Sequence, residues 1–288
     1  MALPVKQAAR DARKRIWRNQ LQTIVRLEIK KNFFRWRGLW VYFLAFGPAV
    51  IIGLHTIGSI LHPDRMGAHP IDEDTNVLAG IFRLFYLHLG IYFGCMGIFT
   101  RLFRGEMMER SLHYYFLAPV RRELLVIGKF LAGVVAASTI FSVAVIASYF
   151  LMYGHYGAEG RQLVLGAGLQ QLGAYVGVTI LACCGYGALF LLMGLLFKNP
   201  IVPAVIIAFW ESINGVLPAW LKKLSVIFYL EPLCPVDVPT DGLLNLFLVS
   251  ADPIPAYLAV PGLLLVSGAI LAYACVKIRT VEINYSSE

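Results

Sequence analysis

The chain has 288 residues, of which 58% are hydrophobic and only 15% are charged, and its mean hydropathy is +0.69. This composition is typical of a polytopic membrane protein and excludes an ordinary soluble domain. The formal net charge of +8 comes mainly from basic residues beside apolar segments, so it indicates anionic lipid headgroups rather than nucleic acid as the partner.

Residues 1–38 form a basic arm before the first long apolar segment. Eleven Lys or Arg residues stand against two acids in this arm, and Trp17, Leu21 and Ile24 recur at helical spacing. A basic amphipathic helix with aromatic residues is expected to lie in the membrane interface, with its basic side chains near the headgroups. Because the first long apolar segment starts only near Leu39, we expect no cleavable signal peptide.

Apolar segments long enough to cross a bilayer follow the arm. Bilayer hydrocarbon is ~30 Å thick, so each crossing helix needs ~20 largely apolar residues. The predicted spans are 39–61, 77–102, 130–153, 172–197, 201–216 and 256–278. The sequence therefore predicts an all-α polytopic membrane protein with a six-helix transmembrane domain over 39–278 and a cytoplasmic tail at 279–288.

The fifth span and the segment after it have the least regular pattern. Pro203, Glu211 and Asn214 interrupt this span. Between 217 and 255, apolar pieces that are too short to cross a bilayer alternate with prolines. We therefore expect a short re-entrant or helical segment on the outer side before the last span.

Basic residues are distributed unevenly between the two sides of this topology. With the N-terminus inside, the inner segments hold 20 Lys and Arg residues, whereas the outer segments hold four. The positive-inside rule therefore predicts a multi-pass protein of the cell (inner) membrane, with both termini and the segment 101–129 in the cytoplasm.

The segment 101–129, between the second and third spans, has more order than a simple loop requires. Charged and apolar residues at helical spacing predict a short helix with two different faces. Pro119 would end this helix, because proline cannot donate the next backbone hydrogen bond. From the pattern alone, a charged cytoplasmic loop that only orients the protein is an equally good interpretation. The charged face comprises Glu106, Glu109 and Arg110, and the apolar face comprises Met107, Leu112 and Tyr115.

Three short motifs in this segment carry a family resemblance: EMMERSL at 106–112, LAPVRR at 117–122 and GK at 128–129. Together with the basic N-terminal helix and the six spans, they resemble the membrane (permease) subunit of a type 2 ATP-binding-cassette (ABC) exporter. Where that family commonly has Gly-Thr before the leucine, this chain has Arg110 and Ser111.

The resemblance implies a separate cytoplasmic ATPase subunit and a second permease copy, in a homodimer or a heterodimer. In that family the short cytoplasmic helix docks in a groove of the ATPase and passes its closure to the membrane helices, while the N-terminal helix is a gate-like elbow. The residues expected to face the ATPase are Glu106, Glu109, Arg110, Arg121 and Arg122, with Met107, Leu112 and Tyr115 packing.

The chain lacks a phosphate-binding loop at the place where one would be sought. Such a loop needs a glycine five residues before a Gly-Lys-Ser/Thr sequence, but Glu123 stands at that position and Phe130 follows the lysine. We therefore expect that this chain is not an enzyme by itself and binds no cofactor, and that ATP and Mg²⁺ belong to the partner ATPase. The apolar composition favours a lipid, a hydrophobic drug or a peptide as cargo.

Two ionisable residues fall inside predicted spans, Arg83 in the second and Glu211 in the fifth. Ionisable residues within a membrane are usually paired or line a water-filled path. We expect Arg83 and Glu211 to approach each other near the outer mouth of the pathway. In the alternative, Arg83 extends to the outer water and Glu211 meets water in the re-entrant segment.

Two other functions stay open from the sequence. The first is a non-transporting membrane scaffold or sensor subunit that docks a cytoplasmic partner through the segment 101–129. The second is a di-haem electron-transfer protein with His55 and His88 as ligands, although two lone histidines are more often packed or hydrogen-bonded residues. The sequence has no CxxC pair that would predict a metal site.

Overall fold

The computed structural model describes residues 3–33, 38–61, 70–109, 111–117, 120–166, 168–213, 217–236 and 254–280. Within these ranges the chain is helical and contains no strand. Five of its helices are long and apolar enough to cross a membrane. The predicted all-α multi-pass membrane fold is confirmed, whereas the predicted number of six spans is not.

The helices follow the predicted order along the chain. The basic arm forms α1 (Leu3–Phe33). The long apolar helices are α2 (Leu39–Leu61), a continuous rod of α4 (Ile71–Gly80), the π-helical η2 (Ile81–Ile91) and α5 (Tyr92–Met108), then α7 (Arg122–Tyr153), α9 (Gly168–Leu196) and α14 (Ala256–Lys277). The short elements are α6 (Leu112–Leu117), η3 (Gly154–Tyr156), α8 (Gly157–Leu165), α10 (Ile201–Ser212), α11 (Ala219–Lys222), α12 (Ile227–Leu230), η5 (Glu231–Leu233) and η6 (Ile278–Thr280).

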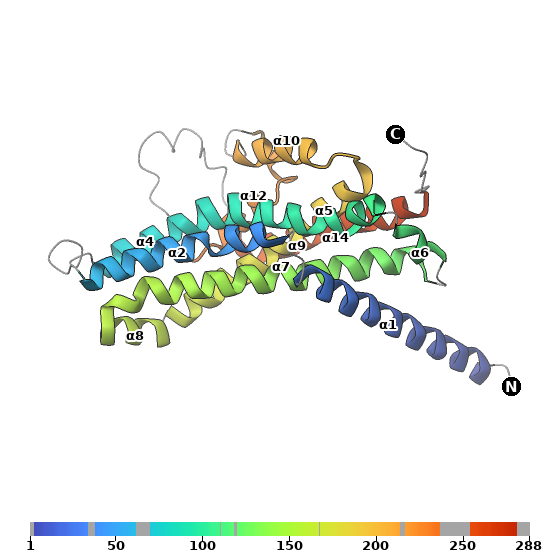
Figure 1. The fold of residues 1–288 in the computed structure, drawn as a ribbon, viewed down its shortest axis with the longest axis horizontal. Coiled ribbons are helices and arrows are strands. Elements are labelled where there is room, and N and C mark those ends of the chain that lie inside the picture. The colour runs from blue at the N-terminus through green and yellow to red at the C-terminus, as the bar shows by residue number, and fades with distance from the viewer. Residues whose placement is uncertain are drawn as a thin grey trace.

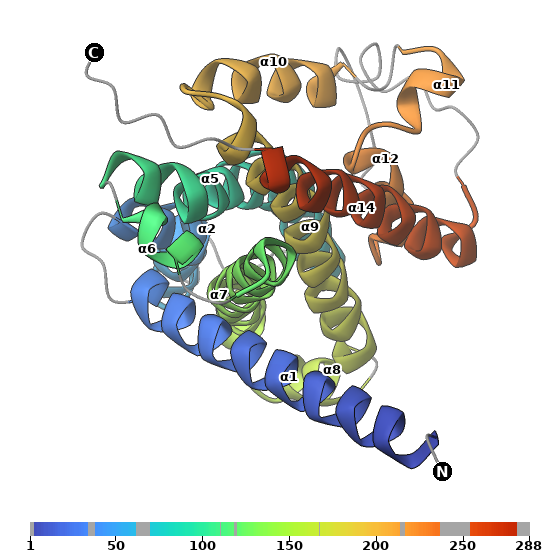
Figure 2. The same ribbon diagram turned by 90° about the vertical axis from the view of Figure 1, so that its right-hand side faces the viewer.

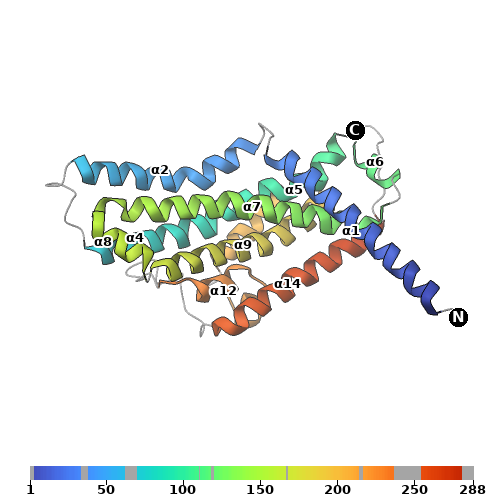
Figure 3. The same ribbon diagram turned by 90° about the horizontal axis from the view of Figure 1, so that it is seen from below.

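The long helices run along one another and α7 lies in the middle of the bundle. It packs against α1, α2 and α9, while α9 packs also against α5 and α14 (Figure 2). We call one end of the bundle the α6 end, because α6 lies there with the adjoining turns of α5 and α7. The opposite end, with α8 and the start of α4, is the α8 end (Figure 1). Helix α1 runs obliquely across the α6 end (Figure 3).

Close contacts at glycines hold α5, α7 and α9 together. The completely buried ring of Phe99 on α5 fits between Gly133 of α7 and Gly187 of α9. Nearer the α6 end, a Cβ added to Gly194 of α9 would stand only 2.7 Å from the carbonyl oxygen of Thr100. Small residues let the backbones of membrane helices approach, and dispersion contacts then replace the lipid that would otherwise lie between them.

The fifth predicted span, 201–216, differs from the structure. In its place lies α10, which has 12 residues. At 1.5 Å per residue this helix is ~18 Å long, well short of the ~30 Å of bilayer hydrocarbon. It ends where the carboxylate of Glu211 accepts hydrogen bonds from the backbone N–H groups of Val226 and Ile227. The chain can turn there because this acid satisfies buried backbone amides at the start of α12.

Short elements nevertheless carry the chain from the α6 end back toward the α8 end. Helix α9 finishes at the α6 end beside Thr100, and α14 finishes there too, where Arg122 donates a 3.0 Å hydrogen bond to the carbonyl of Arg279. Between these two helices, Glu231 of η5 pairs with Arg83, which lies in the half of the bundle nearer the α8 end. Both ends of the described chain therefore lie at the α6 end (Figure 1). That arrangement agrees with the predicted topology, which puts both termini on the same side of the membrane. That this side is the cytoplasm is still a prediction.

The contact at Gly194 leads to a stability prediction. We expect Gly194→Ala to destabilise the protein by about 1–3 kcal/mol, because the new methyl group meets the backbone of α5, which cannot move aside. Gly173→Ala in the same helix is the control, because nothing lies within 4 Å of its added Cβ, and it should be neutral or stabilising. The two variants are compared by heating each in detergent and measuring, by size exclusion, the temperature at which half of the monodisperse protein is lost. Equal midpoints for the two variants would contradict this account of the α5–α9 contact.

Candidate functional site

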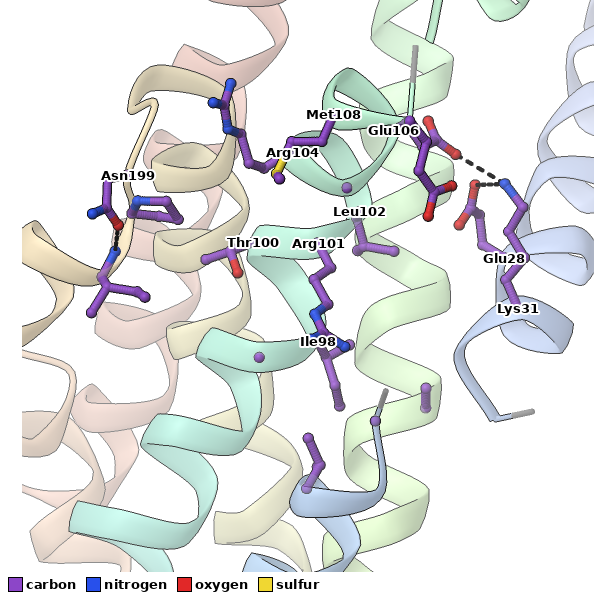
Figure 4. Close-up of a pocket in the computed structure, with 18 of the residues that line it drawn as sticks. Glu28, Lys31, Ile98, Thr100, Arg101, Leu102, Arg104, Glu106, Met108 and Asn199 are labelled. Atoms are coloured by element: carbon purple, nitrogen blue, oxygen red, sulfur yellow. Dashed lines mark hydrogen bonds and ion pairs between the residues drawn. The ribbon is translucent and has the colours of Figure 1, made fainter. Parts of the chain in front are cut away.

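Four charged side chains meet at the α6 end, where α1, α5 and α7 converge beside α6. Figure 4 shows three of them, Glu28, Lys31 and Glu106. The ammonium of Lys129 lies 2.7 Å from Oε1 of Glu28 and 2.9 Å from Oε1 of Glu106. The ammonium of Lys31 lies 3.0 Å from Oε1 of Glu106 and donates a 3.2 Å hydrogen bond to the hydroxyl of Tyr115 on α6. We call Glu28, Lys31, Glu106 and Lys129 the four-charge cluster. It joins residues from α1, α5 and α7.

Burial makes these contacts strong constraints on the fold. The side chain of Lys129 is completely buried, and those of Glu28 and Glu106 are only 4% and 8% exposed. A buried ion is strongly destabilising unless it is paired, and the two ammonium groups balance the two carboxylates. The ring of Tyr115 lies 5.2 Å from the Lys129 ammonium and adds a cation–π contact. The three helices must therefore keep this arrangement together.

The local sequence explains how α1 comes so close to α7. Gly128 has no side chain, and a Cβ there would stand 2.7 Å from Cγ2 of Ile24 on α1. Ile24 can therefore lie directly on the α7 backbone, where it is 6% exposed. Glu28 follows Ile24 by four residues, so it shares the same face of α1 and reaches Lys129, the residue after the glycine. The Gly128-Lys129 pair thus provides both the space and the charge for this crossing.

Lys31 stays charged over the whole physiological pH range. Partial burial opposes its charged form, but the carboxylates of Glu28 and Glu106 outweigh that effect and raise the pKa of Lys31 above its ordinary value. A lysine whose pKa is raised on folding stabilises the fold at neutral pH, and this contribution disappears only as the pH rises through the raised pKa. The Lys31 contacts are therefore permanent links at neutral pH.

The position of Glu106 corrects a sequence prediction. We expected this residue to face a partner, but only 6% of it is exposed and its Oε1 lies between the two lysines of the four-charge cluster. The physical reason is that Lys129 enters the bundle beside the end of α5 and needs a nearby carboxylate. Glu109, three residues further, is exposed at the end of α5. Arg110 lies outside the described residues.

The apolar residues of the segment lie toward the bundle. Leu112 at the start of α6 is completely buried. Met107 and Tyr115 are partly buried and pack against the core. Helix α6 has only six residues, too few to be stable as an isolated helix in water. These contacts therefore determine where it lies.

The two arginines after α6 contact other parts of the chain. Arg121 is exposed, and its guanidinium carbon lies 4.4 Å from the ring centroid of Trp17 on α1. Arg122 donates a hydrogen bond to the carbonyl of Arg279, and Nε of Arg279 lies 2.6 Å from Oε1 of Glu123. The first turn of α7 is therefore tied to α1 on one side and to the end of α14 on the other.

The predicted pair of Arg83 and Glu211 does not form. Nη2 of Arg83 instead donates a 3.0 Å hydrogen bond to Oε1 of Glu231. Glu211 is 6% exposed, and its carboxylate is occupied by hydroxyl and amide donors. These donors are the hydroxyls of Tyr186 and Ser225 and the backbone N–H groups of Val226 and Ile227. A carboxylate with this many donors needs no cation, so Arg83 pairs with the more accessible acid.

Comparison with known proteins adds no assignment, since no protein-family model matches the chain and no curated protein matches it. In the part of the chain that the structure describes, no group of three or more His, Cys, Asp or Glu side chains is arranged to hold a metal ion. A functional proposal therefore rests on the geometry of the α6 end and on the sequence motifs there.

The four-charge cluster predicts a specific pattern of stability. We expect Lys129→Met to destabilise the protein by about 3–5 kcal/mol, because two nearly buried carboxylates then share only Lys31. Adding Glu28→Met should recover much of the loss, since the remaining pair of Lys31 and Glu106 is neutral. Lys30→Met, on the exposed face of α1, is the control. Thermal unfolding in detergent measures all four proteins, and a double variant less stable than Lys129→Met would contradict the cluster.

The pair of Arg83 and Glu231 predicts rescue by charge exchange. We expect Arg83→Glu and Glu231→Arg each to lower the thermal midpoint, because each places two like charges side by side. The combined exchange should restore it. The combination of Arg83→Glu with Glu211→Arg is the comparison, and it should show no rescue because Arg83 does not pair with Glu211. Rescue in that second combination alone would reject the assignment.

Proposed function

We propose that this chain is the permease subunit of an ABC exporter, which forms a pathway through the membrane and is driven by ATP hydrolysis on a separate ATPase subunit. One observation carries the proposal: the short helix α6 lies outside the bundle but is linked through Tyr115, Lys31 and Glu106 to the elbow helix and to two spans. The motifs at 106–112, 117–122 and 128–129 support it.

The physical argument concerns how a movement is transmitted. Closure of an ATPase moves a permease only if a rigid element carries the displacement into the membrane helices. A push on α6 acts on Tyr115 and so on Lys31 of α1, while the adjoining Arg122 acts on the end of α14. The buried ion pairs resist separation, so these helices move together rather than one by one.

The exposed face of the same segment has the chemistry of a protein interface. Leu117 at the end of α6 is 79% exposed and Met108 at the end of α5 is 73% exposed. Glu109 and Arg121 are exposed beside them. Large apolar side chains flanked by charges suit a groove on a protein partner. We assign this face, rather than Glu106, to the ATPase, with ATP and Mg²⁺ bound there.

The remaining features follow from the same proposal. The α6 end is the cytoplasmic side, with both termini, as the excess of basic residues in the predicted inner segments supports. A second permease copy, identical or related, completes the pathway. The apolar composition supports a lipid, a hydrophobic drug or a peptide as cargo.

The proposal is tested by separating binding from transmission. We expect the tagged full chain to co-purify with an ABC ATPase, and Leu117→Glu with Glu109→Arg to weaken that complex at least roughly 30-fold, as for loss of an interface hot spot. Glu159→Arg, exposed on α8 at the other end of the bundle, is the matched control.

Two outcomes separate the candidate functions. Unchanged complex formation and unchanged cargo-stimulated ATP hydrolysis in the Leu117→Glu, Glu109→Arg variant would reject docking through α6. A complex that depends on these residues, but whose ATP hydrolysis responds to no cargo, would favour the scaffold or sensor subunit instead.

A further inference from the structure

A pocket of ≈ 430 Å³ opens at the α6 end beside the four-charge cluster. Its walls come from the start of α2, the last turns of α5, the middle of α7 and the turn before α10. Figure 4 shows Thr100, Arg101 and Arg104 on α5 in the middle of the view, with Asn199 to one side of this helix and Glu28, Lys31 and Glu106 to the other. Met108 and Glu109, which the proposed function assigns to the ATPase face, belong to the lining, but the proposed function gives the pocket itself no role.

The pocket has an excess of positive charge. The members of the four-charge cluster that border it are already balanced by one another and by Lys129. The rest of the lining contains the cations Arg101, Arg104 and Lys198 and a single acid, Glu109. The excess is therefore two positive charges. Nε of Arg104 is also buried without a hydrogen-bond partner, and a buried donor of this kind favours a ligand that can accept a hydrogen bond from it.

The other half of the lining is apolar and leads to the lipid-facing surface. Val41, Ile98, Leu102 and Ile140 line the pocket, and Ile201 at the start of α10 stands at its edge and is 58% exposed. The surface continues along α2 and α10, where the exposed apolar side chains include Trp40, Phe43, Val202 and Val205. A free anion would use only the charged wall. A ligand with an anionic head and apolar chains would use both.

The pocket also lies at the level where lipid headgroups are expected. It begins at Gly38, immediately before α2, and includes Arg101, beside the predicted end of the second span at residue 102. Arginine binds phosphate oxygens with parallel hydrogen bonds from its planar fork, and basic pockets between membrane helices hold anionic headgroups.

We propose that this pocket binds the phosphate headgroup of an anionic phospholipid from the adjoining leaflet. Arg104, with its unpartnered Nε, donates to the phosphate, Arg101 and Lys198 add positive charge around it, and the acyl chains lie along α2 and α10. Because Glu28 and Glu106 form part of the wall, an occupied pocket stabilises the junction of α1 with α5. The inference does not depend on an ATPase partner and can be tested on this chain alone.

The experiment titrates the purified full chain, in a neutral detergent, with three probes: short-chain phosphatidylglycerol, short-chain phosphatidylcholine and inorganic phosphate. Calorimetry gives the dissociation constants, and the thermal midpoint gives the stabilisation by each probe. We expect phosphatidylglycerol to bind most tightly and to raise the midpoint. Each guanidinium removed should weaken its binding about fivefold, so Arg101→Gln with Arg104→Gln should weaken it about 25-fold.

Two further variants keep this result interpretable. Arg101→Lys with Arg104→Lys preserves the charge and should retain most of the binding, so a loss seen only with glutamine is not a folding defect. Lys30→Gln removes an exposed charge at the same end, outside the pocket, and should bind as the unmodified chain does.

Several results would overturn the assignment. An affinity for inorganic phosphate equal to that for phosphatidylglycerol would make this a site for a free anion. An equal affinity for phosphatidylcholine would show that the charged wall does not select anionic headgroups. A loss with Lys30→Gln as large as that with Arg101→Gln and Arg104→Gln together would indicate only general surface charge. No binding of phosphatidylglycerol would reject the site itself.

Discussion

The completely buried ammonium of Lys129 is the constraint on which the α6 end depends. An ammonium inside a helix bundle must have carboxylates at hydrogen-bond distance, and Glu28 and Glu106 supply them at 2.7 and 2.9 Å. One acid lies on α1 and the other near the end of α5, so neither helix can leave α7 without exposing a buried charge to apolar surroundings. Lys31 then neutralises the second carboxylate and extends the contact to Tyr115 on α6.

This constraint also explains why the functional surface and the internal links lie so close together. The segment between α5 and α7 is short, so residues three apart must serve different purposes. Glu106 faces inward and holds helices together, whereas Glu109 is exposed. The proposed ATPase face and the proposed phosphate pocket therefore both adjoin the four-charge cluster. Any ligand at either site acts on the same three helices.

Local patterns were sufficient for much of this fold. The apolar segments and the basic arm are visible because helix formation and membrane burial depend on neighbouring residues. The contacts of individual charges, in contrast, depend on residues that are distant in sequence. Arg83, for example, donates a hydrogen bond to Glu231, which lies 148 positions further along the chain. The fifth span is not confirmed, and the local pattern does not reveal the contact that follows it, since the backbone amides that Glu211 satisfies lie further along the chain at Val226 and Ile227. A usable signal did exist at the α6 end: Glu28 is one of only two acids in the arm, and Lys129 lies beside an apolar segment.

Two kinds of contact therefore hold this protein together: close packing at glycines between the long helices, and charged contacts that fix the short segments. Membrane helices gain no hydrophobic free energy from leaving lipid for one another, so α5, α7 and α9 pack where glycines permit close approach. The segments that do not cross on their own need a more specific anchor. Glu211 holds the start of α12, Glu231 attaches η5 to η2, and the four-charge cluster attaches α1. Because a buried charge accepts few partners, these anchors determine the position of each short segment, whereas apolar packing alone would let it slide.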